Sequence, residues 1–225
     1  MITFYFNGSP NPTKVALFLE EAGLPYEPVA VDTRKGEQFA PDFVKLNPNG
    51  KVPVIVDDGT VVFDSNAILL YLAEKTGRFL APAHERGALL SWLMFVATGI
   101  GPFSGQAVHF RHFAPEKVAY AHDRYQFEVR RHYGVLEQHL AGREWMVGDA
   151  YGIVDMAVWG WARMLPFVLG EGAFEAFPNL KRHHDAIAAR PAAAKAVALK
   201  DRFTFKAEMD AEARGHMFKH LTPAA

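Results

Sequence analysis

The stretch ITFYFNGSPNPTKVALFLEEAG, residues 2–23, decides the fold because it reads as a strand, a turn and a helix in succession. The apolar run at 2–6 predicts a strand. The turn that follows is rich in residues that break regular structure, namely Gly8, Pro10 and Pro12. Asn11 is a good N-cap and Pro12 suits the first helical position, so we expect a helix over residues 12–23.

The residues that follow, up to position 80, add three strands and two helices. They are expected at 27–32 (strand), 37–46 (helix), 52–56 and 60–63 (strands) and 65–76 (helix). Asp57-Asp58-Gly59 between two apolar runs is a good hairpin signal. A strand–helix–strand start requires a crossover and a parallel pair, whereas the hairpin adds antiparallel strands. This order predicts an α/β domain of thioredoxin-like type.

The rest of the chain predicts an all-α domain. Residues 87–110 contain no Asp, Glu, Lys or Arg and are long enough to span a bilayer, but their glycines and proline favour a buried helix that breaks near Gly99–Gly105. Further helices are expected at 116–141, 153–165, 178–190 and 192–200. We therefore expect a thioredoxin-like domain at 1–78, a linker at 79–85, a helical domain at 86–205 and a tail at 206–225.

Composition excludes several classes of function. The 225 residues carry a formal net charge of −1, so no polybasic surface for nucleic acid is expected and a small ligand is more natural. The chain has no cysteine, which rules out disulfides, cysteine-ligated zinc and a cysteine nucleophile. The N-terminus MITFYF shows no signal-peptide pattern, so we expect a cytoplasmic protein that does not bind a membrane. No metal is expected, because no carboxylate cluster accompanies the histidine pairs His109/His112 and His183/His184.

Three motifs occur in the order and spacing of a known family. NPNGKVP at 47–53 matches the element NPxGKVP, FDSNAI at 63–68 matches an E/D-S-x-A-I element, and YGIVD at 151–155 matches a helix-start motif. Over about residues 1–200, the chain resembles the cytosolic glutathione transferases, which join a thioredoxin-like domain to an all-α domain. In the third motif Gly152 replaces the usual Ser or Thr, so only Asp155 of the capping box can reach back.

Finer features resemble the nu class, which is related to the folded domain of the yeast nitrogen-regulator prion protein. They are Ser9-Pro10-Asn11, KGEQF at 35–39 and GIGP at 99–102, with Ser9 where relatives often have Thr. The resemblance implies an enzyme that uses glutathione to reduce a small disulfide or an organic hydroperoxide. Two alternatives stay open, a conjugating transferase that attacks an electrophilic carbon, and a binding or regulatory protein without turnover.

A glutathione site needs groups for two carboxylates and an ammonium. The resemblance implies that the Val52–Pro53 bond is cis and presents its backbone to the cysteinyl residue, although a trans proline at an edge strand is the alternative. Asp64 can pair with the ammonium, and Ser65 at a helix start can hold a carboxylate, unless the pair only caps that helix. Gln38 and Lys51 are candidates for the glycyl carboxylate, or else solvated surface residues.

The turn between the first strand and helix can hold the sulfur that glutathione brings. Asn11 and Ser9 can each donate a hydrogen bond to it, and the positive end of the helix acts in the same direction. Such bonds lower a thiol pKa by about one to two units from about 8.5. The alternative is that Asn11 only caps the helix and Ser9 only shapes the turn. Tyr5 is the rival donor, because other transferase classes use a tyrosine near this place, although Tyr5 can simply pack.

The resemblance also implies a homodimer, in which Arg131 reaches a glutathione carboxylate of the neighbouring subunit. Arg130 is adjacent, and the sequence does not show which of the two arginines would reach the site. The alternative is that the arginine only lies on a solvated face of the helix. Four aromatic residues can line a substrate pocket or belong to the core, namely Phe103, Phe110, Phe203 and Phe205.

Overall fold

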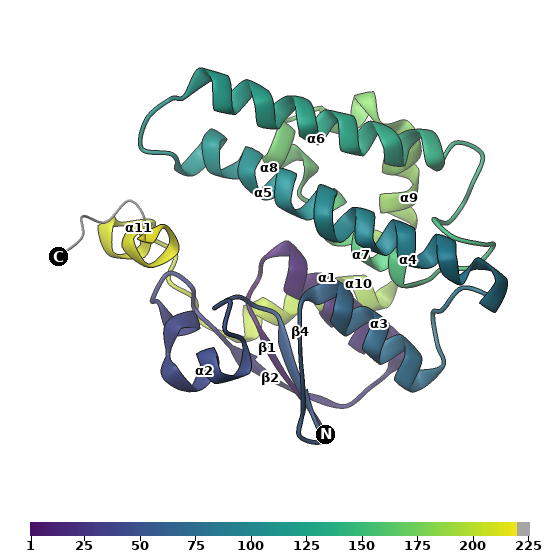
Figure 1. Cartoon of the computed structure of the whole chain (residues 1–225), viewed down its shortest axis with the longest axis horizontal. Coiled ribbons are helices and arrows are strands. Elements are labelled where there is room, and N and C mark those ends of the chain that lie inside the picture. Colours follow the sequence, from purple (N-terminus) through teal and green to yellow (C-terminus); the bar gives the residue numbers. More distant parts are fainter. Residues whose placement is uncertain (220–225) are drawn as a thin grey trace. The chain divides into compact units, whose positions relative to one another are not determined.

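The computed structural model describes residues 1–219, and their contacts divide the chain into two units (Figure 1). One unit contains the β-sheet and consists of residues 1–71 together with 194–219. The other is helical and consists of residues 72–193. Of the tail expected at 206–225, residues 220–225 lie outside the described part, and the domain limits expected from the sequence stay a prediction.

The first unit is built on a four-stranded mixed sheet, which confirms the thioredoxin-like order. Its strands are β1 (Ile2–Phe6), β2 (Tyr26–Ala30), β3 (Val54–Asp57) and β4 (Thr60–Phe63). In the order β2-β1-β3-β4, β1 is parallel to β2 and antiparallel to β3, and β3 is antiparallel to β4. Asp58 and Gly59 connect β3 to β4, and both have the positive φ that a two-residue hairpin of this kind requires.

Several helices belong wholly or partly to this unit. They are α1 (Pro10–Ala22), α2 (Pro41–Leu46, after a 3-10 turn at Glu37–Phe39), α3 (Ser65–Thr76, which continues into the second unit), α10 (Pro191–Ala198, which begins in the second unit) and α11 (Ala211–Met217). Fully buried side chains on α1 and α3 include Val15, Phe18, Leu19, Ile68 and Leu69. Because α1 starts four residues after β1 and α3 starts two after β4, both helix starts are placed by the sheet.

The second unit consists of packed helices. They are α4 (Arg86–Phe95), α5 (Gly101–Val108), α6 (Ala119–His139), α7 (Ile153–Ala162), α8 (Leu165–Leu169) and α9 (Pro178–Ala188). The single helix expected at 153–165 is wrong at its end, because α7 stops at Ala162 and a new helix contains Pro166. Proline lacks the N–H that a continuing helix needs but fits the first turn of the next one.

The break expected near Gly99–Gly105 is also wrong. The chain stays helical over Ala83–Phe113, with a π turn at Val96–Ile100 that joins α4 to α5. A Cβ on Gly99 would lie 2.5 Å from Cδ2 of His132 on α6, so this glycine permits close packing instead of ending the helix. By length and composition the helix could cross a bilayer, a test that core helices of soluble proteins also pass.

Asp155 organises the start of α7. Its side chain is 1% exposed, and its Oδ2 accepts a hydrogen bond from Gly152 N at 2.8 Å, so Asp155 reaches back as expected. Its Oδ1 accepts from Met146 N at 2.8 Å and lies 2.8 Å from Nε2 of His183 on α9. One buried carboxylate therefore satisfies a helix start, a loop and a neighbouring helix.

Replacing Asp155 by alanine should lower the free energy of unfolding by about 3 kcal/mol or more, because it leaves several buried donors without an acceptor. Urea unfolding followed by circular dichroism measures the loss. Asp123→Ala is the matched control, since that aspartate on α6 is 82% exposed and its loss should change stability by less than about 0.5 kcal/mol. Equal effects of the two substitutions would contradict the role given to Asp155.

Candidate functional site

The turn between β1 and α1 places Ser9 and Asn11 at a helix start. Ser9 is the N-cap and Pro10 is the first helical residue. The prediction that Asn11 is the N-cap and Pro12 the first helical residue is therefore wrong by two positions. Both prolines fit here because N–H groups in the first turn have no acceptor within the helix. The exposed Ser9 side chain makes no capping hydrogen bond, so the helix does not use its hydroxyl.

A cavity of about 220 Å³ is lined by this turn, by the loop before β3 and by the start of α3. Its lining residues are Asn11, Asn47, Asn49, Lys51, Val52, Pro53, Phe63, Asp64 and Ser65. Six of them are candidates from the sequence, namely Asn11, Lys51, Val52, Pro53, Asp64 and Ser65. The fold thus brings the candidate sulfur donor together with the candidate ammonium and carboxylate holders. Asn47, Asn49 and Phe63 were missed, although the first two belong to the NPNGKVP motif.

The loop before β3 is shaped by the buried side chain of Asn47. Its Nδ2 donates to the carbonyl oxygen of Lys51 at 2.7 Å, and its Oδ1 accepts from Asn49 N at 3.0 Å. Gly50 takes a φ of 60°, a conformation that glycine adopts without a Cβ clash. The Val52–Pro53 bond is cis, which confirms the prediction. The loop is held by its own polar groups, so Lys51 stays at the cavity.

Asp64 caps α3 and also lines the cavity. Its Oδ1 accepts hydrogen bonds from Asn66 N at 2.8 Å and from Ala67 N at 3.2 Å. Its φ of 69° is in the left-handed region, which is uncommon outside glycine but tolerated by aspartate. Asp64, rather than Ser65, is thus the residue that caps the helix. Ser65 is the first helical residue, and within residues 1–219 its hydroxyl makes no hydrogen bond.

Four candidates from the sequence do not line this cavity, namely Tyr5, Gln38, Arg131 and Ser9, the last of which lines a second cavity. The ring of Tyr5 packs edge-on against Phe43, with centroids 5.8 Å apart, in a small apolar cluster beside α2. The Gln38 side chain is 4% exposed, and its Nε2 donates to the carbonyl of Thr33 at 3.2 Å. Arg131 lies in the helical unit, where its Nε donates to Oε2 of Glu128 at 2.9 Å.

A second cavity, of about 340 Å³, is lined by Ser9 on the other side of the same turn. Its remaining lining residues are Asn7, Gly8, Asp32, Thr33, Arg34, Lys200, Phe205, Lys206 and Met217. Of the four aromatic candidates, Phe205 lines this cavity and Phe203 packs edge-on against Phe6. In the helical unit, Phe110 lines a different cavity and Phe103 packs on His132.

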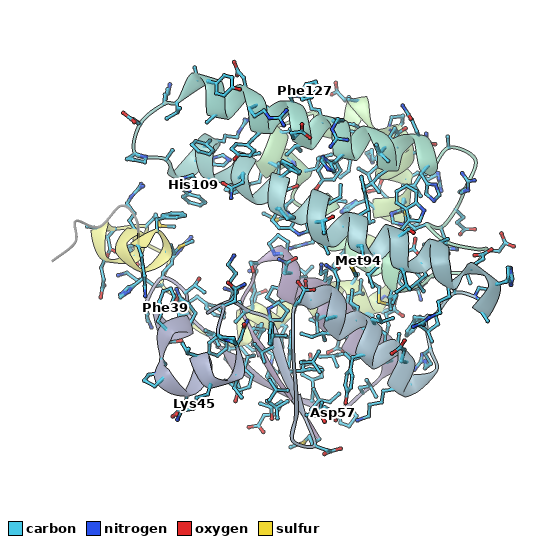
Figure 2. The ribbon with its side chains drawn as sticks, in the orientation of Figure 1. Phe39, Lys45, Asp57, Met94, His109 and Phe127 are labelled. Atoms are coloured by element: carbon cyan, nitrogen blue, oxygen red, sulfur yellow. The ribbon has the colours of Figure 1, made fainter. Side chains whose placement is uncertain are left out.

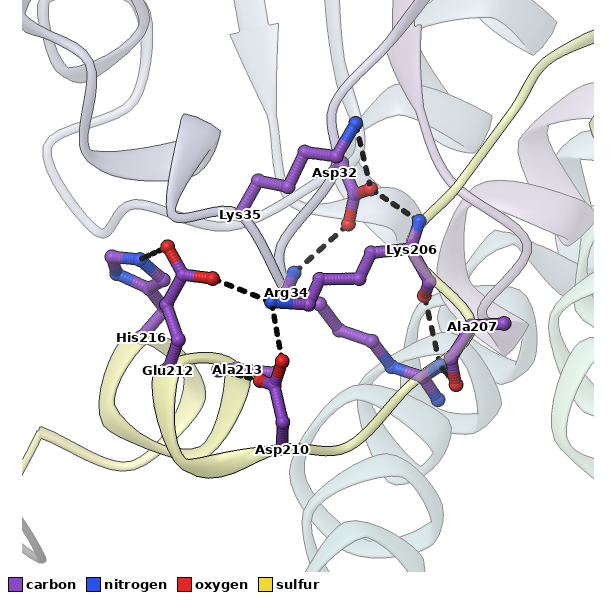
Figure 3. A network of polar contacts seen from close by, with 9 residues as sticks. All are labelled: Asp32, Arg34, Lys35, Lys206, Ala207, Asp210, Glu212, Ala213 and His216. Carbon is purple, nitrogen blue, oxygen red and sulfur yellow. Dashed lines mark hydrogen bonds and ion pairs between the residues drawn. The ribbon is translucent and has the colours of Figure 1, made fainter.

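The C-terminal segment is fixed to the loop after β2 by a polar network (Figure 3). The carboxylate of Asp32 accepts from Arg34 N at 3.0 Å and from Lys206 N at 2.6 Å. The Lys206 ammonium in turn pairs with Asp210 at 2.9 Å and with Glu212 at 2.6 Å at the start of α11. Since Arg34 also donates to the Lys206 carbonyl, this segment is a fixed wall of the second cavity. Sequence reasoning gave no structure for it.

Comparison with known proteins agrees with this architecture. Residues 1–74 match the family model for the glutathione S-transferase N-terminal domain, and residues 97–191 match that for the C-terminal domain. The disulfide-bond oxidoreductase YfcG of Escherichia coli K12 is 43% identical over 205 residues, which cover 88% of this chain and 94% of that protein. Protein URE2 of Eremothecium gossypii is 34% identical, in an alignment that covers 86% of this chain and 66% of that protein.

A solved structure gives the same result. A glutathione transferase from Burkholderia graminis, with two glutathione molecules bound per subunit, superposes with a TM-score of 0.83 at 40% identity. The alignment covers 90% of this chain and 89% of that one. Matches of this extent confirm the resemblance found in the sequence. The chain therefore belongs to the glutathione S-transferase family, as an enzyme of its nu-like branch that includes the URE2 proteins.

Proposed function

We propose that this enzyme reduces small disulfides at the expense of glutathione. The observation that supports this most is the cavity at the two helix starts, where Asn11, Lys51, Asp64 and Ser65 lie together. Its groups are complementary to the ammonium, carboxylates and thiol of glutathione. Similarity to YfcG, whose name describes a disulfide-bond oxidoreductase, supports a disulfide as the second substrate.

The proposed placement of glutathione follows from the charges around the cavity. The γ-glutamyl ammonium pairs with Asp64, whose Oδ2 makes no hydrogen bond to any described residue. The neighbouring carboxylate binds at Ser65 and the start of α3, where the helix dipole favours an anion. The glycyl carboxylate binds Lys51, because the amide of Gln38 is committed to Thr33. The sulfur then lies near Asn11 at the start of α1.

The reaction is thiol–disulfide exchange. The glutathione thiolate attacks one sulfur of the substrate disulfide, so an S–S bond to glutathione forms and the other substrate half leaves as a thiolate. A second glutathione thiolate then attacks the mixed disulfide, giving glutathione disulfide and the second substrate thiol. Because the chain has no cysteine, no mixed disulfide between the substrate and the protein can form.

The second cavity is the proposed site for the leaving half of the disulfide. Ser9 lines it and Asn11 lines the first, so the two cavities share the turn that holds the sulfur. Arg34, Lys200 and Lys206 line it together with the carboxylate of Asp32. Lys200 pairs with Asp201 and Lys206 with Asp210 and Glu212, so the positive charge offered to a ligand is mainly that of the Arg34 guanidinium, which donates to backbone carbonyls. This charge suits a thiol compound that carries carboxylates, such as a second glutathione. The Burkholderia graminis relative holds two glutathione molecules per subunit, which supports the arrangement.

A turnover panel with glutathione tests the function directly. Purified enzyme should reduce small disulfides, with glutathione disulfide formed in equal amount. A dithiol without carboxylates and ammonium should not replace glutathione, because it cannot use the first cavity. Organic hydroperoxides and an aryl halide complete the panel. Faster conjugation of the aryl halide, with no disulfide turnover, would reject the proposal in favour of a conjugating transferase.

The glutathione site itself is tested by two substitutions that keep the fold. Asp64→Asn retains a capping oxygen and tolerates the positive φ, but removes the charge that pairs with the ammonium. Ser65→Ala removes the hydroxyl. Each should raise the dissociation constant of glutathione roughly 10- to 100-fold, since a charge-assisted hydrogen bond is lost. Calorimetry measures the dissociation constant, and Asp42→Ala, at a side chain that is 94% exposed, is the control. Unchanged affinity in both site variants would remove the site assignment.

We also propose that the enzyme is a cytoplasmic homodimer. Large apolar side chains stand exposed on two helices of the second unit, with Met94 on α4 45% exposed and Phe127 on α6 60% exposed (Figure 2). Exposed apolar side chains that gather into a patch mark protein–protein interfaces, so these two residues are the candidates for that surface. Arg131, on the same helix α6, is the candidate that would reach the partner's glutathione.

Sedimentation should therefore give twice the monomer mass. Phe127→Glu should shift the equilibrium toward monomer, because a charge would be buried in the interface. If Arg131 reaches the partner's site, Arg131→Ala should raise the KM for glutathione while Arg130→Ala leaves it unchanged. A monomer at working concentration would reject the proposed dimer. A larger effect of Arg130→Ala than of Arg131→Ala on the KM would assign the contact with the partner's glutathione to Arg130.

A further inference from the structure

A buried lysine lies next to the candidate glutathione site without lining it. Lys14, on α1, is 1% exposed, and its Nζ donates a hydrogen bond of 2.9 Å to Oδ1 of Asn66. Asn66 is itself buried and is the second residue of α3. The pair therefore joins the helix that carries Asn11 to the first turn of the helix that begins at Ser65.

Burying the charged form of Lys14 beside a neutral amide costs free energy, which a bound anion would offset. Buried ammonium groups in proteins are normally paired with a carboxylate, because removing a charge from water is expensive. Here the hydrogen-bond partner is a neutral amide. Burial lowers the pKa of Lys14 to about 7, and the charge of Asp64 raises it in part. Asp64 is the ionised group that faces Lys14 among residues 1–219, and it does not hydrogen-bond to the ammonium.

The position of Lys14 relative to the cavity suggests what the charge does. Asn66 follows Asp64 and Ser65 directly in the chain, and those two residues line the cavity on the same helix turn. The dipole of α3 is positive at this end. A protonated Lys14, bonded to Asn66 in the first turn of α3, adds a full positive charge to the positive end of this helix dipole. An anion bound at Ser65 would be the missing counter-charge.

We propose that Lys14 is a positioning residue of the glutathione site, a buried positive charge that Asn66 holds at the first turn of α3 to strengthen binding of the ligand carboxylate at Ser65. The inference rests on the proposed function, because it assigns this residue a role in the same site. Lys14 does not touch the ligand, and it acts through the electrostatic potential of the helix turn.

The proposal requires that ligand binding draws a proton from solvent above neutral pH. Because burial lowers the pKa of Lys14 to about 7, we expect its neutral form to predominate in the ligand-free protein at pH 8. A bound carboxylate favours the ammonium form, so it raises the proton affinity of Lys14 and a proton is taken up. By linkage, the ligand then binds more tightly as pH falls from 8 to 6.5, where Lys14 is already largely charged.

Isothermal titration calorimetry measures this proton uptake. The ligand is S-methylglutathione, whose sulfur carries no titrating proton. Titrations at pH 8 in two buffers with different ionisation enthalpies give the number of protons taken up. Wild-type protein should take up a clear fraction of a proton per site. Lys14→Met should take up none and should bind about tenfold more weakly at pH 6.5. Lys45→Met, which removes an exposed lysine on α2, should behave as wild type.

Asn66→Asp provides a second variant if Lys14→Met does not fold. A carboxylate at position 66 keeps Lys14 charged before the ligand arrives, so proton uptake should disappear although the lysine is present. A purely structural role for Lys14 would leave the proton count unchanged. Wild-type affinity in Lys14→Met at pH 6.5, or wild-type proton uptake in either variant, would overturn the proposal. Absence of binding by the wild type would instead reject the proposed function, and this role with it.

Discussion

The start of α3 is the constraint on which the site depends. Its first N–H groups have no acceptor within the helix, and the Oδ1 atom of Asp64 satisfies those of Asn66 and Ala67. To do so, Asp64 adopts a left-handed conformation that costs on the order of 1 kcal/mol or more for a residue other than glycine. The same strained position keeps the carboxylate at the cavity, next to Ser65. In the proposed site, folding and ligand recognition therefore use one side chain, and a change that harms either affects both.

The remaining chemistry comes from the ligand. A chain without cysteine cannot perform thiol–disulfide exchange on its own, so in the proposed reaction the protein contributes position and electrostatics while glutathione contributes sulfur. In the proposed site, Asn11 and the start of α1 supply donors at one side, and the start of α3 with Lys14 behind it supplies positive potential at the other. The Ser9 hydroxyl is not needed as a cap, so it is available on the side of the second cavity.

The sheet unit was predictable because its signals are local. Strands β1 and β4 and helix α3 have the expected bounds, since apolar runs, the Asp58-Gly59 turn and a helix start each act within a few residues. The N-cap of α1 was misplaced because both Ser9 and Asn11 precede a proline, and local preference does not separate them. The continuous helix through Gly99 was missed because the reason for that glycine is His132, 33 positions away.

The candidate site shows the same limit. Six residues of the cavity lie in local motifs and were found, whereas Lys14–Asn66 and Asp32–Lys206 are contacts between distant segments. A lysine on an apolar helix face reads as an ordinary charged residue until the packing shows it buried. Tyr5 was a rival sulfur donor because other transferase classes use a tyrosine near this place, and only packing shows its ring against Phe43.

The central claim is that the turn at the start of α1 activates the bound thiol. Carbon-13 NMR of glutathione labelled at the cysteinyl Cβ, titrated at saturating protein, reports the pKa of that thiol. The account predicts a value about one to two units below the free thiol, with the shift largely lost in Asn11→Ala and kept in Tyr5→Phe. A bound thiol that titrates at or above its free value, or a shift lost in Tyr5→Phe and kept in Asn11→Ala, would contradict it.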